Sequence, residues 1–509
     1  MKISPGGEFF IGYLKEIPME WLILPPLLLP FTGVVVTLLT RKRRALQLGL
    51  ALAIMLLALL STCALTWGVM ANQQGLVLHS GLWTAPIGIA LVADPLTVLM
   101  LLMTHLVLTA GILYALGSTE KVVQYPTFYP LFFGLATGLS GAFLTGDMLN
   151  LFVFTEVIVI TATALTGIAD DEFGVEASYK YILISTVAST FFLLGIGSLY
   201  AVYGTLNIAQ LSELINKHPL SPLTLAGMVL LTVTFLTKSA TFPFHFWQPD
   251  FHAAAPTPVS AMLSSVVVKV GVYGLLRMTS LLFVSEAHAL RPLLVLLGVV
   301  GVVYGGFGAA GTHNAKRMLA YSTLSQIGFI LVGIGWDTPL SIAAALVFAF
   351  NHALVKSAML MLAGAMASRA AVKSASFDVV VGVGKYHPFA GALFLLGGMA
   401  LAGIPPTNGF LSKLGIFWSG IEAAQYLPLA IIGVASILTL FYVISAFIKI
   451  WFKQKPAVKP KQGDHLLAPA LLIGLCLLLG LWGEPLIQFA QTVTDWISVP
   501  LNYVSIVIR

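Results

Sequence analysis

Residues 223–247 read LTLAGMVLLTVTFLTKSATFPFHFW, an apolar run that contains Lys238 and Pro243 near its end. About twenty apolar residues cross the roughly 30 Å of hydrocarbon in a bilayer, so the run predicts a membrane-spanning helix. Proline removes a backbone hydrogen bond, and lipid cannot replace it, so such a break survives only beside protein or a water-filled cavity. The stretch therefore predicts a broken transmembrane helix that carries a buried lysine.

The rest of the chain has the composition of an integral membrane protein. Of its 509 residues 58% are hydrophobic and only 9% are charged, and the mean hydropathy is +0.95. In soluble proteins roughly a quarter of all residues are charged. The fold class predicted is all-α and polytopic, with about fourteen spans near residues 21–40, 46–70, 92–117, 128–146, 148–168, 178–204, 223–247, 255–277, 291–312, 317–336, 340–368, 388–420, 427–449 and 466–489.

The basic residues predict the orientation, because Lys and Arg concentrate in cytoplasmic loops. Only Lys217, Arg277 and Arg291 fall in one set of alternate loops, whereas sixteen cations fall in the other. The net charge of +6 therefore reflects the orientation of the chain in the membrane and does not indicate a nucleic-acid partner. The chain is predicted to be a multi-pass protein of the cell (inner) membrane, with no cleaved signal peptide and both termini on the non-cytoplasmic side. The sixteen are Arg41, Lys42, Arg43, Arg44, Lys121, Lys180, Lys316, Arg317, Arg369, Lys373, Lys385, Lys449, Lys453, Lys455, Lys459 and Lys461.

Five ionisable residues lie inside predicted spans: Glu156, Lys238, Lys269, Lys356 and Lys413. Each costs about 2.5–3.5 kcal/mol at a helix centre, so together they would cost roughly 12–18 kcal/mol, more than a typical net stability. Groups this costly usually mark an ion or proton path. Two structural alternatives stay open, since the last two lysines could snorkel to the interface and the glutamate could serve only as a partner for a lysine.

A second broken helix predicts an internal repeat. Residues 402–410 read AGIPPTNGF, a harder break than the first. If spans four to eight and nine to thirteen form two units, each broken helix is fourth in its unit, and five helices per unit make the second unit inverted. Matching breaks in two halves of a transporter point to its pathway. The predicted segments are 1–127 (three helices), 128–280 and 281–450 (the repeats), and 451–509 (a basic loop and a C-terminal helix).

Span eleven offers two titratable groups side by side. His352 and Lys356 are four residues apart and share one helix face. This pair could link the two units. His245, within the first break, is a further candidate for proton relay.

Four stretches resemble the antiporter-like subunits of respiratory complex I, membrane-bound hydrogenases and Mrp multisubunit cation/proton antiporters. Residues 242–263 (FPFHFWQPDFHAAAPTPVSAML) and 269–277 (KVGVYGLLR) resemble signatures of this superfamily. Residues 145–156 (TGDMLNLFVFTE) and 83–94 (WTAPIGIALVAD) look most like the D subunit of Mrp antiporters. The resemblance spans about residues 80–450 and implies a proton-translocating subunit that works beside other membrane subunits.

The resemblance also implies roles for single residues. Glu156 resembles the family's glutamate, Lys238 its partner lysine and Lys269 its bridging lysine. His352 and Lys356 resemble the central linkers, and Lys413 the terminal ionisable residue. Four departures from the family pattern leave these ionisable groups intact: Thr155, Phe246, Gln248 and Phe251.

These residues lead to a hypothesis in which Glu156 and Lys238 form a switchable ion pair that feeds protons to the remaining groups. The sequence shows no phosphate loop, dinucleotide fingerprint or cysteine cluster, so we expect no catalytic centre, cofactor or metal, and the transported ions would be protons with sodium as a candidate for exchange. Energy must come from an ion gradient or a redox partner. The alternatives are a subunit of a redox complex, an independent transporter of an organic solute, and a structural subunit with vestigial charges.

Overall fold

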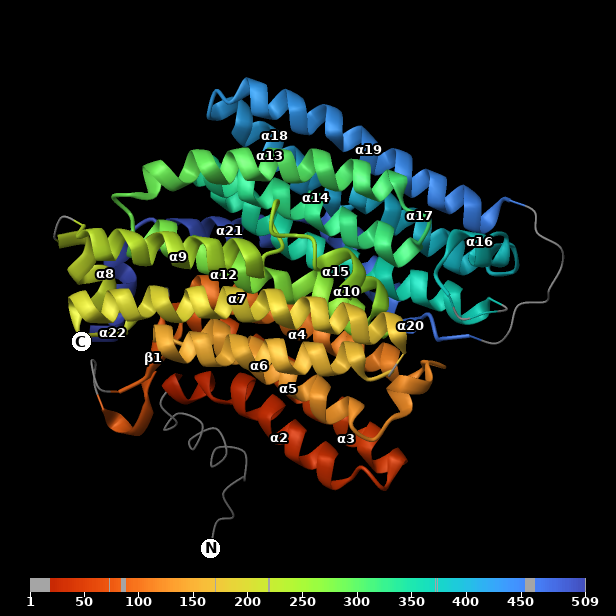
Figure 1. The fold of residues 1–509 in the computed structure, drawn as a ribbon, viewed down its shortest axis with the longest axis horizontal. Helices are drawn as coiled ribbons and strands as arrows, with labels where there is room; N and C mark the ends of the chain where they lie inside the picture. Colours follow the sequence, from red (N-terminus) through yellow and green to blue (C-terminus); the bar gives the residue numbers. More distant parts are fainter. Residues whose placement is uncertain are drawn as a thin grey trace, which may run out of the picture.

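The computed structural model describes residues 19–72, 74–83, 88–169, 171–217, 220–370, 372, 374–453 and 463–508. This part of the chain is almost entirely helical (Figure 1). In the first half the elements are η1 (Met19–Ile23), α2 (Pro25–Leu39), α3 (Arg44–Asn72), β1 (Leu76–His79), η2 (Ser80–Leu82), β2 (Ala90–Ala93), α4 (Pro95–Leu116), η3 (Lys121–Gln124), α5 (Phe128–Leu144), α6 (Met148–Gly167), α7 (Glu172–Tyr203), α8 (Ile208–Lys217), α9 (Pro222–Lys238), α10 (Gln248–Ala254), α11 (Thr257–Met262), the π-helical η4 (Leu263–Val267), α12 (Val268–Arg277) and the π-helical η5 (Met278–Leu282).

The second half continues the same pattern of long helices and short connections. Its elements are α13 (Ala287–Gly311), α14 (Ala315–Trp336), α15 (Pro339–Arg369), α16 (Phe377–Val380), η6 (Val383–Tyr386), α17 (Pro388–Ala402), α18 (Asn408–Glu422), α19 (Tyr426–Trp451), α20 (Leu467–Leu481), α21 (Glu484–Ile497) and α22 (Pro500–Ile508).

The number of apolar segments agrees with the predicted number of spans. Among the described residues nine helices are long and apolar enough to cross a membrane, and two bent pairs of helices raise the number to eleven. Three shorter apolar helices of the described chain, α2, α5 and α9, bring the number of apolar segments to fourteen. The chain is therefore a multi-span membrane protein, as its hydropathy predicts.

The helices run side by side between two ends of the molecule (Figure 1). At one end, which we call the basic face, Asp250 forms ion pairs with Lys180 and Arg317, and Arg44 donates to the backbone of Val123. The other end, which we call the opposite face, contains β1, β2, α8 and α22. The alternation of basic loops in the sequence thus corresponds to two distinct faces.

The opposite face contains structure that hydropathy did not predict. Strands β1 and β2 pair antiparallel with Leu76 opposite Ala93, and α8 is a short amphipathic helix between α7 and α9. Residues 84–87, within one of the stretches that resemble Mrp subunits, lie outside the described residues. These small elements are local, and the fold remains all-α in its membrane part.

Both predicted breaks are present. Helix α9 ends at Lys238, the backbone turns at Ala240 (φ 54°), and α10 begins at Gln248. Helix α17 ends at Ala402, Gly403 adopts φ 82°, and α18 begins at Asn408. Because proline and left-handed residues cannot continue an α-helix, each span is divided into two half-helices with a non-helical segment between them.

The order of helices matches the predicted two units of five spans, and the inversion of the second unit stays a prediction. The first unit comprises α5, α6, α7, the broken pair α9 and α10, and the span from α11 to η5. The second comprises α13, α14, α15, the broken pair α17 and α18, and α19. The division of the chain at residues 127, 280 and 450 stays a prediction, and residues 454–462 of the predicted basic loop lie outside the described residues.

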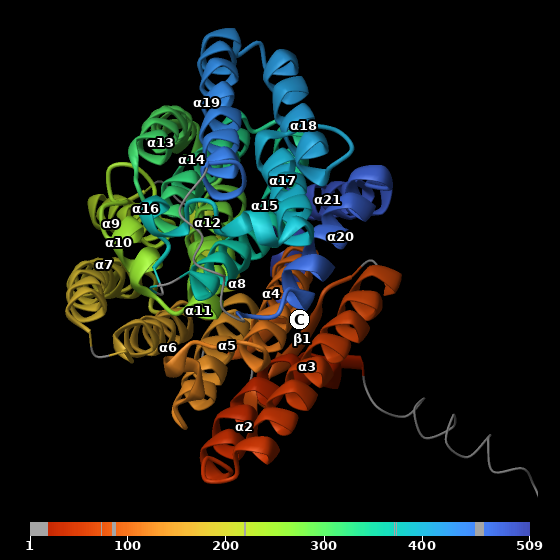
Figure 2. The same ribbon diagram turned by 90° about the vertical axis from the view of Figure 1, so that its right-hand side faces the viewer.

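Two helices form the centre of the molecule (Figure 2). The most apolar 18-residue stretches of α15 and of the span from α11 to η5 are completely buried, whereas in α3, α13 and α19 only 28%, 39% and 33% of such a stretch is buried. Gly271 of α12 lies so close to α9 that a Cβ atom there would be 2.4 Å from the backbone nitrogen of Ser239. This contact places the end of α9 directly against α12.

The last span differs from its prediction as one helix over residues 466–489. Helices α20 and α21 meet at an angle of 79°, and the bend falls at Trp482 and Gly483, just before Pro485. Proline is well tolerated in the first turn of a helix, so Pro485 permits α21 to begin but not α20 to continue. Hydropathy is insensitive to such a bend because both halves are apolar.

Candidate functional site

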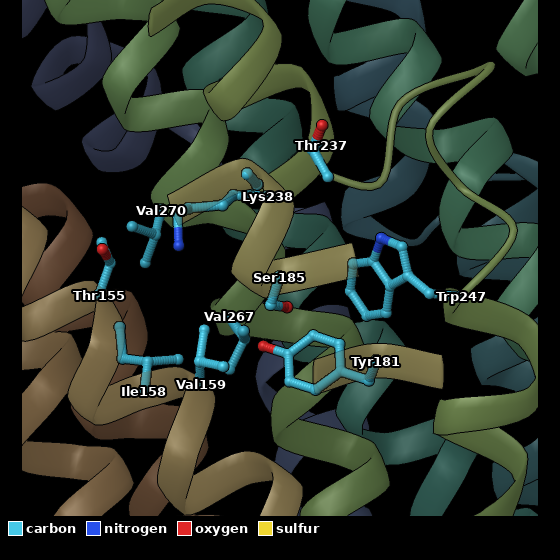
Figure 3. A pocket seen from close by; sticks show the side chains of 11 residues that line it. Thr155, Ile158, Val159, Tyr181, Ser185, Thr237, Lys238, Trp247, Val267 and Val270 are labelled. Atoms are coloured by element: carbon cyan, nitrogen blue, oxygen red, sulfur yellow. The ribbon is translucent and has the colours of Figure 1, made fainter. Parts of the chain in front are cut away.

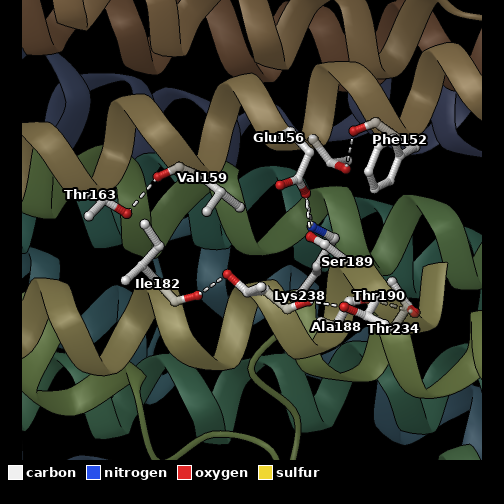
Figure 4. A network of polar contacts seen from close by, with 12 residues as sticks. Phe152, Glu156, Val159, Thr163, Ile182, Ala188, Ser189, Thr190, Thr234 and Lys238 are labelled. Carbon is white, nitrogen blue, oxygen red and sulfur yellow. Dashed lines mark hydrogen bonds and ion pairs between the residues drawn. The ribbon is translucent and has the colours of Figure 1, made fainter. Parts of the chain in front are cut away.

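The first pair of ionisable groups lies between α6 and α9. Nζ of Lys238 is 3.9 Å from Oε1 of Glu156, and the side chains are 10% and 29% exposed. Ser189 of α7 donates a hydrogen bond to the same carboxylate oxygen (Figure 4). Within the described residues the ammonium makes no hydrogen bond. The two groups are thus close enough to attract each other without a direct hydrogen bond between them.

A cavity lies beside Lys238 and extends to the helix that carries Lys269. Its wall includes Val267 and Val270, which flank that lysine in the chain (Figure 3). The ammonium of Lys238 and the hydroxyl of Tyr181 point into this space. The volume open to the centre of a water molecule is about 20 Å³, and roughly 10–15 Å³ accommodates one water. The remaining wall residues are Thr155, Ile158, Val159, Ser185, Ala188, Thr237 and Trp247.

Lys269 forms a hydrogen bond with Nδ1 of His352 at the centre of the molecule. The lysine is fully buried on α12, and the histidine is buried on α15. A hydrogen bond between an amine and an imidazole nitrogen needs one donor and one acceptor, so one proton lies between these two nitrogens. The structure thus brings together two predicted relay residues that are 83 positions apart in the chain.

Lys356 has different partners from those of its helical neighbour His352. Its ammonium donates to the backbone oxygen of Leu319 (3.2 Å) and to the hydroxyl of Ser322 (2.7 Å), both on α14. Tyr442 of α19 donates to the same hydroxyl (2.7 Å). The two predicted linkers therefore share a helix face, but their polar ends lie in separate environments.

Lys413 lies on α18, after the second break. Its ammonium donates to the backbone oxygen of Ala402 (2.9 Å) and is 5.4 Å from the centre of the Phe329 ring. The carbonyl is free to accept because the break ends helix α17 there. The side chain is buried, so Lys413 does not snorkel, and a small cavity separates it from His352.

His245 is placed apart from these groups. Its ring lies 5.5 Å from the ring of Phe242 and 4.7 Å from that of Tyr304 on α13. Within the described residues no side-chain hydrogen bond joins this imidazole to the other predicted relay residues. Its part in the relay stays a prediction.

The structure corrects the placement of Arg277, which the sequence had assigned to a loop. Arg277 is buried at the end of α12, where Nη1 is 2.6 Å from Oδ2 of Asp94. Its guanidinium also lies 5.0 Å from the ring of Tyr273 and 4.9 Å from that of Tyr503 on α22. The partner lies far away in the sequence, so no local signal marks the pair. Asp94 and Asp147 also cap the first turns of α4 and α6.

The sequence reasoning also missed two polar residues near the predicted groups. Ser189 contacts Glu156, but a serine in an apolar helix gives no signal by itself. His252 is completely buried, has no hydrogen-bond partner for either ring nitrogen among the described residues, and lies within electrostatic range of Lys269 and Lys356. Only the packing of α10 against α14 reveals its position.

Comparison with known families places the chain in one of them. The family described as "NADH:quinone oxidoreductase/Mrp antiporter, TM" matches residues 145–439, which is more than half of the chain. The chain belongs to this family. The matched region contains Glu156, all four buried lysines and both broken helices. The resemblance that the sequence motifs carry is thereby confirmed.

Individual proteins resemble this chain over nearly its full length. The chain is 32% identical to the D subunit of the Na(+)/H(+) antiporter of Alkalihalophilus pseudofirmus, over 96% of this chain and all of the relative. A chain of the Mrp complex from Dietzia sp. superposes with a TM-score of 0.86 at 26% identity, covering 96% of this chain and 99% of that one. A chain of an archaeal respiratory membrane complex, the membrane-bound sulfane sulfur reductase, superposes with a TM-score of 0.88 at 29% identity, covering 95% and 99%.

Proposed function

We propose that this chain is the proton-translocating D-type subunit of a multisubunit Na⁺/H⁺ antiporter of the Mrp type. One observation carries the proposal: buried ionisable groups form a row through both repeats, from Glu156 and Lys238 through Lys269 and His352 to Lys413. The similarity to antiporter D subunits over the full length of the chain supports it. Groups so costly in a membrane are retained where ions or protons move.

In the proposed mechanism the Glu156–Lys238 pair acts as a switch. When the pair is closed, the carboxylate and the ammonium stabilise each other's charged form. When they separate, the ammonium of Lys238 loses that attraction and can pass a proton through water in the neighbouring cavity to the hydrogen-bonded pair of Lys269 and His352. Histidine suits this step because it has two ring nitrogens, of which one can accept a proton while the other donates one. From there the proton continues toward Lys413.

We further propose that the basic face is cytoplasmic. Cations concentrate at that face, and the positive-inside rule orients such a face toward the cytoplasm. The described chain starts at η1, which contacts β1, and ends with α22, which contacts α8, so both ends lie at the opposite face. Both termini would then be non-cytoplasmic in a cell membrane, although residues 1–18 and 509 themselves lie outside the described residues.

The test measures sodium-dependent proton movement in everted membrane vesicles from an antiporter-deficient host that expresses the complete gene cluster. The chain is intact or carries Lys238→Ala, and Lys217→Ala is the control, since Lys217 is exposed and pairs with Glu213 on α8. We expect sodium to dissipate the pH gradient with the intact chain and the control but not with Lys238→Ala. Full activity of Lys238→Ala in an assembled complex would contradict the proposal.

The TM-score of 0.88 with a chain of a respiratory membrane complex favours a second function. In that case proton movement would be coupled to electron transfer in partner subunits. The same vesicles distinguish the two functions. If sodium has no effect although the complex assembles, and an electron donor drives proton uptake instead, the redox-coupled function replaces the antiporter.

A further inference from the structure

A small cavity lies between His352, which is hydrogen-bonded to Lys269, and Lys413. It lies between α14, α15, α17 and α18, and the volume open to the centre of a water molecule is about 10 Å³. That is about the space that one water needs. Its polar lining residues are Gln326, Asn351, His352, Ser412 and Lys413.

Two polar groups of residues in the cavity wall have no partner within the part of the chain that the structure describes. Nε2 of Gln326 and Nε2 of His352 are buried, and neither makes a hydrogen bond within the described residues. A buried polar group without a partner costs about 1–3 kcal/mol, and an enclosed water that reaches two such groups removes most of that cost. Both unpartnered nitrogens belong to residues that line one water-sized space, so a single water can satisfy them together.

The walls of this cavity are held in place by amide groups. Nδ2 of Asn351 donates to the backbone oxygen of Asn408 (3.2 Å) and to the hydroxyl of Ser412 (2.8 Å), and Nδ2 of Asn408 donates back to Oδ1 of Asn351 (3.0 Å). These bonds connect α15, which carries His352, to the first turns of α18, which carries Lys413. The distance across the cavity is thereby fixed.

Lys356 does not line this cavity, because its ammonium is turned to Leu319 and Ser322 on α14. His352 therefore faces two ways. Its Nδ1 binds Lys269, its Nε2 has no hydrogen-bond partner among the described residues, and the residue lines the cavity that Lys413 also lines. A proton that reaches the imidazole on one side can leave on the other without passing Lys356.

We propose that Gln326 is a positioning residue that holds a water between Nε2 of His352 and Nζ of Lys413, so that protons pass between these two groups without Lys356. The carboxamide N–H of Gln326 donates to the water oxygen. Nε2–H of His352 gives its proton to that oxygen, and the water gives one of its own protons to the neutral amine of Lys413, so the water is restored. This inference rests on the proposed proton relay and adds a residue and a route to it.

The test compares substitutions of two buried glutamines in the complete complex. Gln326→Met removes the donor at similar volume, and Gln326→Asn keeps a carboxamide that is one methylene shorter. Gln47→Met is the matched control, because Gln47 is buried on α3 and, among the described residues, its side chain bonds to none of the relay groups: it donates to backbone oxygens of Thr37 and Pro126 and accepts from Arg44. Proton transport is measured in everted vesicles in H₂O and D₂O, and assembly is checked by co-purification of the other subunits.

We expect Gln326→Met to lower the transport rate by about tenfold or more, because a misplaced proton carrier can cost up to roughly a hundredfold, and to increase the effect of D₂O on the rate. Gln326→Asn should fall between it and the intact chain, and Gln47→Met should match the intact chain. A native rate with a native D₂O effect in Gln326→Met, while Lys238→Ala is inactive, would refute only this inference. Native rates in both Gln326→Met and Lys238→Ala would refute the proposed proton relay as well.

Two further outcomes also decide the matter. Equal slowing by Gln326→Met and Gln47→Met, with an unchanged D₂O effect, would indicate general destabilisation and overturn the inference. If Gln326→Met prevents assembly, Gln326→Asn decides: a reduced rate with a larger D₂O effect supports the inference, and native behaviour contradicts it.

Discussion

At the residue scale, the partner of each buried lysine differs although the side chain is the same. One faces a carboxylate, one an imidazole, one a hydroxyl together with a carbonyl, and one a single backbone carbonyl. These partners are respectively Glu156, His352, Ser322 with Leu319, and Ala402. Because nearby charges and hydrogen bonds decide how strongly a group holds its proton, four identical side chains can form an ordered series of proton carriers.

The hydroxyl of Ser189 is predicted to tune the switch. It donates to Oε1 of Glu156, and a hydrogen bond of this kind is worth about 0.5–1.5 kcal/mol net. We expect Ser189→Ala to change the rate of sodium-dependent proton movement by roughly two- to tenfold, because the carboxylate loses a donor in the closed pair. Vesicle transport assays of assembled complexes measure this.

Two variants of the same helix serve as controls for this prediction. Ser189→Thr keeps a hydroxyl and should retain most of the activity. Ser198→Ala removes a hydroxyl on α7 whose one bond to the described residues goes to the backbone oxygen of Leu194 (2.8 Å), and it should behave as the intact chain. Equal rates for Ser189→Ala and Ser198→Ala would show that the contact to Glu156 does not matter for transport.

At the element scale, interrupted helices create the polar positions. The end of α9 at Lys238 and the end of α17 at Ala402 expose backbone groups inside the protein, and one of these carbonyls accepts from Lys413. Helix α12 with Lys269 is flanked by two π-helical turns, which occur frequently at functional sites. The regular helices hold these segments in position, and the irregular ones carry the chemistry.

The close approach of α12 to α9 is predicted to depend on Gly271. A Cβ atom there would be 2.4 Å from the nitrogen of Ser239 and 2.5 Å from the oxygen of Phe235, both backbone atoms that cannot turn away. We expect Gly271→Ala to lower the free energy of unfolding by about 1–3 kcal/mol and to reduce transport, because α12 must move away from Lys238. Thermal unfolding in detergent and the vesicle assay measure both effects.

Gly197 on α7 provides the matched substitution, since a Cβ atom there would meet nothing within 4 Å. Gly197→Ala should leave transport unchanged and the stability equal or slightly higher, because alanine is the better helix former. If Gly271→Ala were as stable and active as Gly197→Ala, the packing of α9 on α12 would not constrain the relay.

At the scale of the whole molecule, a buried ion pair joins segments from both ends of the chain. Asp94 precedes α4, Arg277 ends α12, and Tyr503 of the C-terminal helix α22 lies against the guanidinium. The pair lies at the opposite face, near one end of the helix that carries Lys269. The ion pair and the contact with Tyr503 therefore fix α12 relative to α4 and to α22.

Breaking this pair is predicted to destabilise the fold. Removal of one partner of a buried ion pair typically costs 3–5 kcal/mol, because the other charge is left buried alone. We expect Arg277→Met to lower the free energy of unfolding by about that amount. The double variant with Asp94→Asn should recover part of the loss, since the asparagine keeps an oxygen that can cap α4. Unfolding of the purified complex in detergent measures both, and an equal loss in the single and double variants would argue against the pair.

Much of the fold could be predicted because the controlling properties are local. Apolar runs give the spans, alternating basic loops give two faces, and prolines inside runs at residues 243 and 405–406 give the breaks. The bend between α20 and α21 was not predicted because both halves are apolar. The strands β1 and β2 were not predicted because each is only four residues long.

The sequence by itself determined that the chain spans a membrane, which helices are broken and which ionisable residues lie inside, since a charge within an apolar run is visible without any partner. The tertiary structure decided which of these groups meet. Lys269 bonds to His352, Lys356 turns away to Ser322, and Arg277 leaves its predicted loop for Asp94. The physical reason is that such contacts depend on how each helix is rotated against neighbours that lie far away in the chain, and spacing within one helix carries no information about that rotation.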